Sequence, residues 1–215
     1  MTRFILVRHG ESQANLENRF AGQIDIPLTE TGLTQAECTG EYLKNEKIDV
    51  FYSSELSRAH DTACAVAKHH NKPVTKLKGL NEINGGDWEN KTYPQIASSF
   101  PDNYKTWNTI IGLTQCNGGE NVKEVQERVF ACIFELAQKH PDQTVFIGFH
   151  GMALRAFLCK VMNVPLEKMH SDSCWASNAS ITYVNYENGK FTLIEHSFDK
   201  HLSDCGLRTT LKLKA

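Results

Sequence analysis

Short apolar runs alternate with amphipathic stretches along most of the chain. The apolar runs at 3–7, 50–52 and 145–149 are too short for helices, and each predicts a buried strand. A weaker strand is expected at 74–77. Apolar positions that step by three and four predict helices at about 30–46, 57–70, 121–140 and 152–162. This alternation favours a mostly parallel sheet that is covered by helices on both faces.

Three local signals refine this pattern. Thr29 is expected to cap the first long helix, and Asn121, with Glu124 three positions later, the longest one. Near the end of the chain, the apolar runs at 181–184 and 191–194 flank Asn188-Gly189, a strong hairpin turn signal. The predicted fold class is therefore α/β, a three-layer α/β/α sandwich whose mostly parallel sheet has an antiparallel edge.

The segment from about 83 to 120 fits this alternation poorly. It is rich in Gly, Asn and Pro, and helical stretches are expected only near 93–100 and 103–111. No change in composition marks a linker. We therefore expect a single domain over residues 1–215, with a lid-like insertion at about 83–120. Trp88, Trp107 and Trp175 are interpreted as packing residues rather than as stacking platforms.

Composition narrows the function. The 215 residues carry 23 Lys+Arg against 25 Asp+Glu, a formal net charge of −2, so the charge balance favours neither nucleic acid nor an anionic membrane. The apolar runs are too short to cross a bilayer or to form the core of a signal peptide. The seven cysteines are scattered without a CxxC pair, so reduced thiols in a cytoplasmic protein are expected, rather than a disulfide framework or a zinc site.

Two predicted strands end in the same dipeptide. The run at 3–7 leads through Arg8 to His9-Gly10, and the run at 145–149 leads to His150-Gly151. Parallel strands with aligned ends would place both histidines at the carboxyl edge of the sheet, where open α/β sheets bind ligands. A glycine after each histidine would let the chain turn sharply and a substrate approach the backbone.

Arginines accompany the histidines. Arg8 lies beside His9, and Arg58 falls in the first turn of the helix that follows the strand at 50–52. An arginine at a helix N-terminus opposes the helix dipole, so it indicates an anion to be neutralised, with an ion pair to Glu55 or Asp61 as the alternative. Two arginines and two histidines around one point suit a phosphoryl group.

Six motifs in order resemble those of the histidine phosphatase superfamily, the phosphoglycerate mutase-like proteins. Residues 8–12 read Arg-His-Gly-Glu-Ser, and Asn15 follows. The other motifs lie at 20–29, 53–59, 80–89, 150–155 and 178–181. The resemblance spans nearly the whole chain. It implies a phosphoglycerate mutase-like fold and a metal-independent phosphomonoesterase that works through a phosphohistidine without a cofactor.

The resemblance also implies a role for each matching residue. His9 would be the nucleophile, and Glu82 the proton donor. Arg8, Arg58 and His150 would hold the phosphoryl oxygens. The substrate-binding residues would be Asn15, Gly22, Gln23 and Gly151.

The chemistry of these residues supports the same mechanism independently of the resemblance. An imidazole with a pKa near 6.5 is about three-quarters neutral at pH 7, and the neighbouring arginines should lower the pKa of His9 further. A neutral ring has a lone pair for in-line attack on phosphorus, and positioned cations stabilise the charge on the equatorial oxygens. A phosphate dianion beside Glu82 should favour the protonated carboxyl that donates to the leaving group.

Three positions depart from the family pattern. Asn121 stands where Ser is usual after Gly-Gly-Glu, and Asn90 stands where Gly is common. Asparagine can cap a helix as serine does, but a substrate contact through the serine hydroxyl would be lost. Gly85, in place of a larger residue, indicates a more mobile or unusually shaped loop after Glu82.

The expected function is hydrolysis of small phosphomonoesters of the phosphosugar or ribazole-phosphate type. A cofactor-dependent phosphoglycerate mutase is the first alternative, although the modest insertion favours the phosphatase. A non-catalytic phosphate-binding regulatory module is the second, and the presence of all five catalytic candidates argues against it. A metal-dependent hydrolase is the third. For the oligomeric state of the protein, we consider a homodimer.

Overall fold

The computed structural model describes residues 1–170 and 174–207. Six strands form one sheet in the order β3-β2-β4-β1-β5-β6. The strands are β1 (Thr2–Arg8), β2 (Val50–Ser53), β3 (Val74–Lys76), β4 (Thr144–Phe149), β5 (Ile181–Glu187) and β6 (Lys190–Phe198). Strands β1 to β4 pair in parallel, whereas β5 and β6 add an antiparallel edge. The predicted α/β fold class is confirmed.

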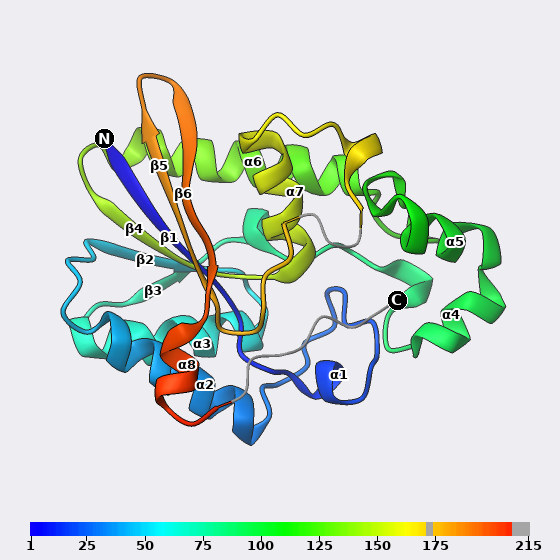
Figure 1. Ribbon diagram of the computed structural model, residues 1–215, viewed down its shortest axis with the longest axis horizontal. Helices are drawn as coiled ribbons and strands as arrows, with labels where there is room; N and C mark the ends of the chain where they lie inside the picture. Colours follow the sequence, from blue (N-terminus) through cyan, green and yellow to red (C-terminus); the bar gives the residue numbers. More distant parts are fainter. Residues whose placement is uncertain (171–173, 208–215) are drawn as a thin grey trace.

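Helices cover both faces of this sheet (Figure 1). On one face α2 (Glu30–Leu43) packs against α3 (Ser57–Ala67), which continues into the 3-10 turn η1 (Lys68–His70). On the other face α6 (Val122–Lys139) packs against α7 (Gly151–Val161). The short helix α1 (Gln13–Leu16) follows β1, and α8 (Lys200–Asp204) packs on α2.

The alternation of side chains along β1 builds two separate cores. Phe4 and Leu6 belong to the larger cluster, which includes residues of α6 and α7. Ile5 and Val7 belong to a second cluster with residues of α2 and α3. Because successive side chains point to opposite faces of a strand, one fully apolar run supplies both layers. This explains why the central residues 4–7 of the strand include no polar position, although Thr2, Arg3 and Arg8 lie at its ends.

The predicted caps and the hairpin turn are present. The Thr29 side chain accepts a hydrogen bond from the backbone N–H of Gly32, and Asn121 and Glu124 form a reciprocal capping box. At the turn between β5 and β6, φ is +50° at Asn188 and +79° at Gly189. A two-residue turn with both central φ angles positive follows the right-handed twist of the strands.

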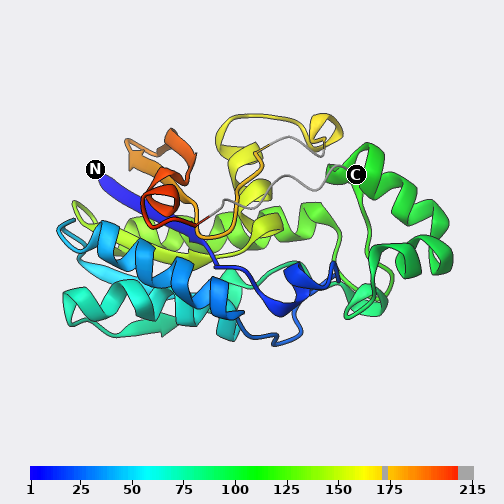
Figure 2. The same ribbon diagram turned by 60° about the horizontal axis from the view of Figure 1, so that its bottom comes forward.

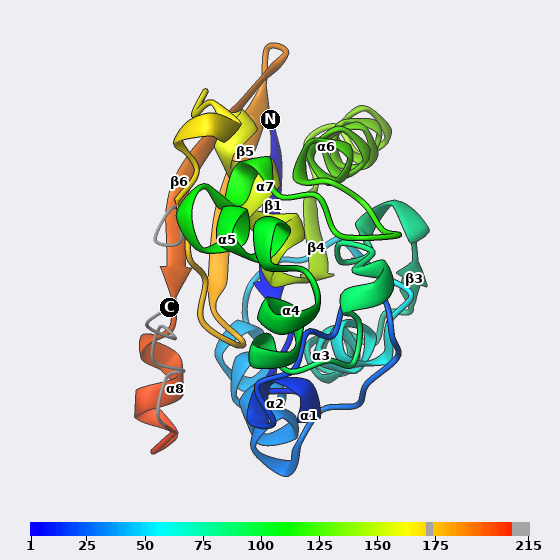
Figure 3. The same cartoon turned by 90° about the vertical axis from the view of Figure 1, so that its right-hand side faces the viewer.

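The irregular segment forms a helical insertion at one end of the molecule. It contains the short turns η2 (Lys78–Leu80), η3 (Gly86–Trp88) and η4 (Ile111–Leu113), and the helices α4 (Tyr93–Ser99) and α5 (Pro101–Thr109). Figures 1 and 2 place α4 and α5 at one end of the molecule, and Figure 3 shows them in front of the sheet. The turn η5 (Leu166–Lys168) lies beside η4.

The expectation that all cysteines are reduced is wrong for one pair. Cys38 on α2 and Cys205, just after α8, form a disulfide with their Cα atoms 6.5 Å apart. They are 167 residues apart in the sequence, so spacing could not reveal the contact that the packing of α8 on α2 creates. The other five cysteines of the chain are free, and Cys116 and Cys159 are buried.

Candidate active site

The two histidines lie side by side at the carboxyl edge of the sheet. In the parallel pairing of β1 with β4, Arg8 faces Phe149, so His9 and His150 are the first residues after the paired strands. The backbone N–H of His9 donates to the Phe149 carbonyl at 2.9 Å. The two imidazole centroids are 5.2 Å apart at an interplanar angle of 61°. The strand-end placement inferred from the sequence is confirmed.

The backbone fixes the tautomer of His9. Its Nδ1 lies 2.7 Å from the Gly10 carbonyl oxygen, which can only accept, so Nδ1 carries the hydrogen. Burial lowers the pKa of His9 well below its usual 6.5, and the positive charges of Arg58 and Arg8 lower it further. The ring is therefore neutral at pH 7, with its lone pair on Nε2.

His150 has the opposite arrangement. Its Nε2 lies 2.6 Å from Ser54 Oγ, which already accepts the backbone N–H of Leu56 at 3.1 Å. Among the described residues, the Ser54 hydroxyl hydrogen has no acceptor other than His150 Nε2, so we assign it there, and Nδ1 of His150 then carries the N–H. This Nδ1 is buried without a hydrogen-bond partner. Burial, followed by the charge of Arg58, lowers the pKa of His150 well below 6.5, so it is a neutral donor.

Arg8 and Arg58 are buried cations whose hydrogen bonds, among the described residues, go to backbone carbonyls. Arg8 Nη1 donates to the Ala176 carbonyl at 2.6 Å, and Arg58 donates to the carbonyls of Ile24 and Gly22 at 2.9 and 2.7 Å. Within the described ranges, no acidic oxygen lies within 4.0 Å of either guanidinium, so the ion pair considered for Arg58 is not formed.

Both guanidiniums keep donors that no hydrogen bond uses. Among the described residues, the Nε atoms of Arg8 and Arg58 are buried without a partner. Burial lowers the pKa of Arg8 to about 10, and the Glu82 carboxylate opposes that effect. The arginine remains charged at pH 7. Two buried positive charges with unused N–H donors form a site that an anion completes.

Glu82 lies at the first turn of α7. Its Oε1 accepts the backbone N–H groups of Ile83 and Ala153 at 2.9 and 3.0 Å, and its Oε2 accepts that of Met152 at 3.1 Å. These three donors orient the carboxyl group at the start of α7. The Glu82 carbonyl accepts from the side-chain amide of Gln23 at 2.8 Å.

The remaining predicted residues have different environments. Asn15 Oδ1 accepts hydrogen bonds from Ser12 N, Ser12 Oγ and Asn178 Nδ2, so a substrate contact by Asn15 would use its amide nitrogen. Gly22 has a φ of +52° and accepts from Arg58. Gln23 holds the backbone of Glu82 and does not line the cavity.

The two glycines after the histidines have different surroundings. A Cβ on Gly10 would lie 2.4 Å from the carbonyl oxygen of Gly32, at the first turn of α2. Gly10 thus allows α2 to approach the His9 loop. A Cβ on Gly151 would meet Arg8 Nε at 3.4 Å, an ordinary van der Waals contact, and Gly151 lines the cavity. The expectation of a close substrate approach at Gly10 is replaced by the contact with α2.

The site opens into a cavity of about 510 Å³. Seven of the nine predicted site residues line it: Arg8, His9, Asn15, Gly22, Arg58, Glu82 and Gly151. His150 is fully buried next to His9, outside this lining. The cavity therefore has two parts. Arg8 and Arg58 line the part that could hold a phosphate, and residues of α4 and α5 line the rest.

Sequence reasoning missed the aromatic part of this lining. Phe20, Tyr93, Tyr104, Trp107 and Trp175 all line the cavity. Trp88 is fully buried as expected, but the interpretation of Trp107 and Trp175 as packing residues is incomplete. The spacing of Tyr104 and Trp107, three apart on a helix of the insertion, was the available signal. Nothing in the sequence placed Trp175 near them.

The departures from the family pattern have structural explanations. Asn121 caps α6 and does not line the cavity. Asn90 has a φ of +60°, a conformation that asparagine tolerates better than most side chains. A Cβ on Gly85 would lie 2.6 Å from the Phe20 ring, so the glycine lets the loop after Glu82 pack closely there.

Two kinds of feature are absent from the described residues. No group of three His, Cys, Asp or Glu side chains in residues 1–170 and 174–207 could hold a metal ion. No helix in those ranges is long and apolar enough to cross a membrane.

Comparison with known proteins agrees with this geometry. The family model of the histidine phosphatase superfamily, branch 1, matches residues 4–199. Phosphoserine phosphatase 1 of Hydrogenobacter thermophilus is 31% identical over 95% of this chain and 96% of its own. The metal-independent phosphoserine phosphatase of Arabidopsis thaliana is 32% identical over 96% and 85%. The solved structure of Bacillus stearothermophilus YhfR superposes with a TM-score of 0.89 at 30% identity, covering 94% of this chain and all of that one.

Proposed function

The chain belongs to branch 1 of the histidine phosphatase superfamily, and on that premise we propose that it hydrolyses small phosphomonoesters through a phosphohistidine on His9. The protein is a phosphoric monoester hydrolase that acts on small phosphorylated metabolites. The observation that carries the mechanism is the neutral His9, with a free Nε2, beside two buried arginines that have no ion-pair partner among the described residues.

In the first step the substrate phosphoryl group sits among Arg8, Arg58 and His150. The Nε atoms of the arginines and Nδ1 of His150 are the unused donors, and phosphoryl oxygens accept from them. His9 Nε2 attacks phosphorus in line as the P–O bond to the alcohol breaks. Glu82, protonated beside the phosphate dianion, gives its proton to the departing oxygen.

In the second step the free carboxylate of Glu82 takes a proton from water. The resulting hydroxide attacks phosphorus, the N–P bond breaks, and its electron pair returns to His9 Nε2. Inorganic phosphate leaves, and both residues regain their starting states. The backbone donors at Met152 and Ala153 hold Glu82 at the start of α7 through both steps.

Trapping the phosphoenzyme tests this mechanism. We expect rapid quenching at neutral or alkaline pH during turnover to give a peptide containing His9 that is heavier by one phosphoryl group. His9→Ala should lose both this adduct and phosphate release, while the exposed His69→Ala should retain both. Turnover by His9→Ala near the wild-type rate would exclude His9 as the nucleophile.

The competing mutase mechanism differs only in what receives the phosphoryl group from His9. Assays with and without 2,3-bisphosphoglycerate separate the two. We expect free phosphate from small monoesters and no stimulated conversion of 3- to 2-phosphoglycerate. Stimulated conversion with little free phosphate would favour the mutase.

Two further proposals concern the cellular location and the oligomeric state of the enzyme. We retain a cytoplasmic location, which the five free cysteines support and the Cys38–Cys205 disulfide weighs against. The homodimer considered from the sequence also stays a prediction. Thiol titration of protein taken directly from cells and the molar mass in solution would decide these two points.

A further inference from the structure

Aromatic side chains surround the part of the cavity that receives the alcohol. They come from three separate segments: Phe20 follows α1, Tyr93, Tyr104 and Trp107 belong to α4 and α5, and Trp175 precedes β5. Phosphoryl binding needs none of them, because the unused donors belong to Arg8, Arg58 and His150. An alcohol group bound in this cavity beside the phosphoryl site would therefore lie against this aromatic wall.

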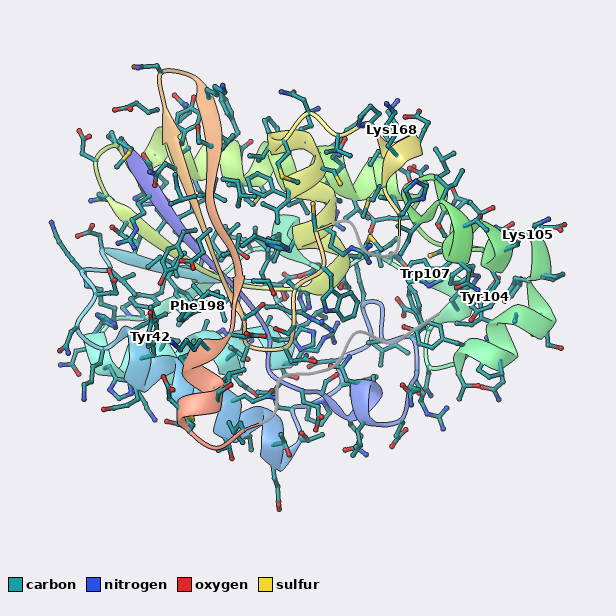
Figure 4. The ribbon with its side chains drawn as sticks, in the orientation of Figure 1. Tyr42, Tyr104, Lys105, Trp107, Lys168 and Phe198 are labelled. Atoms are coloured by element: carbon teal, nitrogen blue, oxygen red, sulfur yellow. A yellow bond between two sulfur atoms is a disulfide. The ribbon has the colours of Figure 1, made fainter. Side chains whose placement is uncertain are left out.

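The two aromatic residues of α5 lie on its inner side. Tyr104 and Trp107 are one helical turn apart, and Figure 4 shows them toward the body of the molecule, with Lys105 at the outer edge. Trp107 packs edge to face on Phe20, with centroids 5.3 Å apart. Tyr104 contacts no other aromatic ring of the described chain and is half-buried. Both therefore keep aromatic surface exposed to the cavity.

Trp175 brings this aromatic wall close to the phosphoryl site. Its ring centroid lies 5.4 Å from the Arg8 guanidinium carbon and 6.0 Å from that of Arg155. Arg8 is one of the groups proposed to hold the phosphoryl oxygens. The leaving group is therefore in reach of Trp175 as soon as its phosphate binds.

Charge restricts which leaving groups this wall would accept. Aromatic rings can bind cations such as quaternary ammonium groups. Here, however, the described part of the lining carries four arginines, Arg8, Arg19, Arg58 and Arg155, against one carboxylate, Glu82. Arg19 also pairs with Glu17, so the excess positive charge nearest the phosphoryl site comes from Arg8 and Arg58. A positively charged alcohol such as choline would be repelled. A small polar alcohol such as serine would leave the aromatic surface in water.

We propose that the preferred substrates are phosphomonoesters whose alcohol carries an uncharged or anionic aromatic ring close to the ester oxygen. This inference rests on the proposed function, since it concerns the same cavity. Ring stacking adds about 0.5–1.5 kcal/mol beyond the area that is buried. We expect kcat/KM to be about three- to tenfold higher for an aromatic ring than for a saturated ring of equal size.

The test uses primary alcohols as leaving groups, so that their chemistry is matched. Benzyl phosphate is compared with cyclohexylmethyl phosphate, which has the same bulk without a π face, and with O-phosphoserine and phosphocholine. We expect kcat/KM to be highest for benzyl phosphate and lowest for phosphocholine. A benzyl to cyclohexylmethyl ratio near one, or a preference for O-phosphoserine, would overturn the proposal.

Variants on α5 locate the effect. Tyr104→Leu should reduce the benzyl to cyclohexylmethyl ratio at least twofold, and Tyr104→Phe should preserve it. Lys105→Ala on the outer side is the matched control and should change neither rate. An undiminished ratio in Tyr104→Leu would remove Tyr104 from the recognition wall. Failure to hydrolyse any of the esters, or full activity in His9→Ala, would instead remove the proposed function and this inference with it.

Discussion

His9 and His150 lie 5.2 Å apart and are both neutral, yet they offer different nitrogens to a ligand. A backbone carbonyl takes the Nδ1 hydrogen of His9 and leaves Nε2 as a base. A serine hydroxyl satisfies Nε2 of His150 and leaves Nδ1–H as a donor. The nearest hydrogen-bond partner thus decides which ring can attack phosphorus and which can bind its oxygens.

Ser54 is therefore a positioning residue for the reaction. Without its hydroxyl, His150 can adopt the tautomer that presents a lone pair to the phosphoryl oxygens. We expect Ser54→Ala to lower kcat roughly ten- to hundredfold, the range of a lost buried hydrogen bond, and Ser54→Thr to restore much of it. Steady-state kinetics over a pH series would measure this.

Ser53→Ala provides the matched control. Ser53 is as buried as its neighbour, but its hydroxyl bonds to the Ser54 carbonyl and to His60, away from the cavity. We expect this variant to change stability more than kcat. An equal loss of kcat in the two variants would show a structural effect instead of control of the tautomer.

Among the elements, α6 shows how a departure in sequence can preserve a structure. The side chain of Asn121 accepts from the backbone N–H of Glu124 at 2.9 Å, and the Glu124 carboxylate accepts from that of Asn121 at 2.8 Å. This box satisfies two N–H groups that a helix start leaves unpaired. Asparagine thus serves the helix where relatives commonly have serine.

We expect Asn121→Ala to lower the free energy of unfolding by about 1 kcal/mol, and Asn121→Ser to change it by only a few tenths. Urea unfolding would measure both differences. Because Asn121 does not line the cavity, kcat/KM should be unchanged in both variants. A loss of activity in Asn121→Ser at unchanged stability would contradict this assignment.

Periodicity predicted the elements well because each depends on its own side chains. The apolar run in β1, the cap at Thr29 and the Asn188-Gly189 turn are local signals, and all were confirmed. The strand-end histidines followed from the same logic, since parallel strands align their ends. The aromatic wall and the disulfide could not be predicted in this way. Each joins segments whose proximity arises only from tertiary packing, such as Trp175 with α5.

Across the whole molecule, buried neutral histidines link stability to pH. The pKa values of His9 and His150 are lowered well below 6.5, and that of His201 is lowered to about 4. Burial is the main cause in each case. The unfolded chain therefore binds more protons than the folded one as pH falls below 6.5, so acid destabilises the fold.

We expect the unfolding temperature to decrease as pH is lowered from 6.5 toward 4, and to be nearly constant between pH 7 and 8. Calorimetry across this range would measure the change. His201→Asn should weaken the dependence, because the buried His201 ring, bonded to Thr39 Oγ1, no longer titrates. Equal slopes in the wild type and this variant would exclude His201 as a contributor.

The Cys38–Cys205 disulfide should also stabilise the whole domain. Crosslinks that close long loops restrict the unfolded chain, and removing one typically costs about 2–5 kcal/mol. We expect a reductant to shift the denaturation midpoint of the wild type to lower denaturant concentration. The double variant Cys38→Ser with Cys205→Ser should unfold at the midpoint of the reduced wild type. Its own midpoint should be the same with and without reductant. Identical midpoints with and without reductant would contradict this expectation.

The same bond closes a large covalent ring within the polypeptide, because Cys38 and Cys205 are 167 positions apart. A protease that cuts once anywhere between them produces two pieces that remain covalently attached. On a denaturing gel such nicked protein would run as a single species until the sample is reduced. Limited digestion of this enzyme therefore has to be analysed under reducing conditions, or cleavage of the insertion that carries α4 and α5 will go unseen.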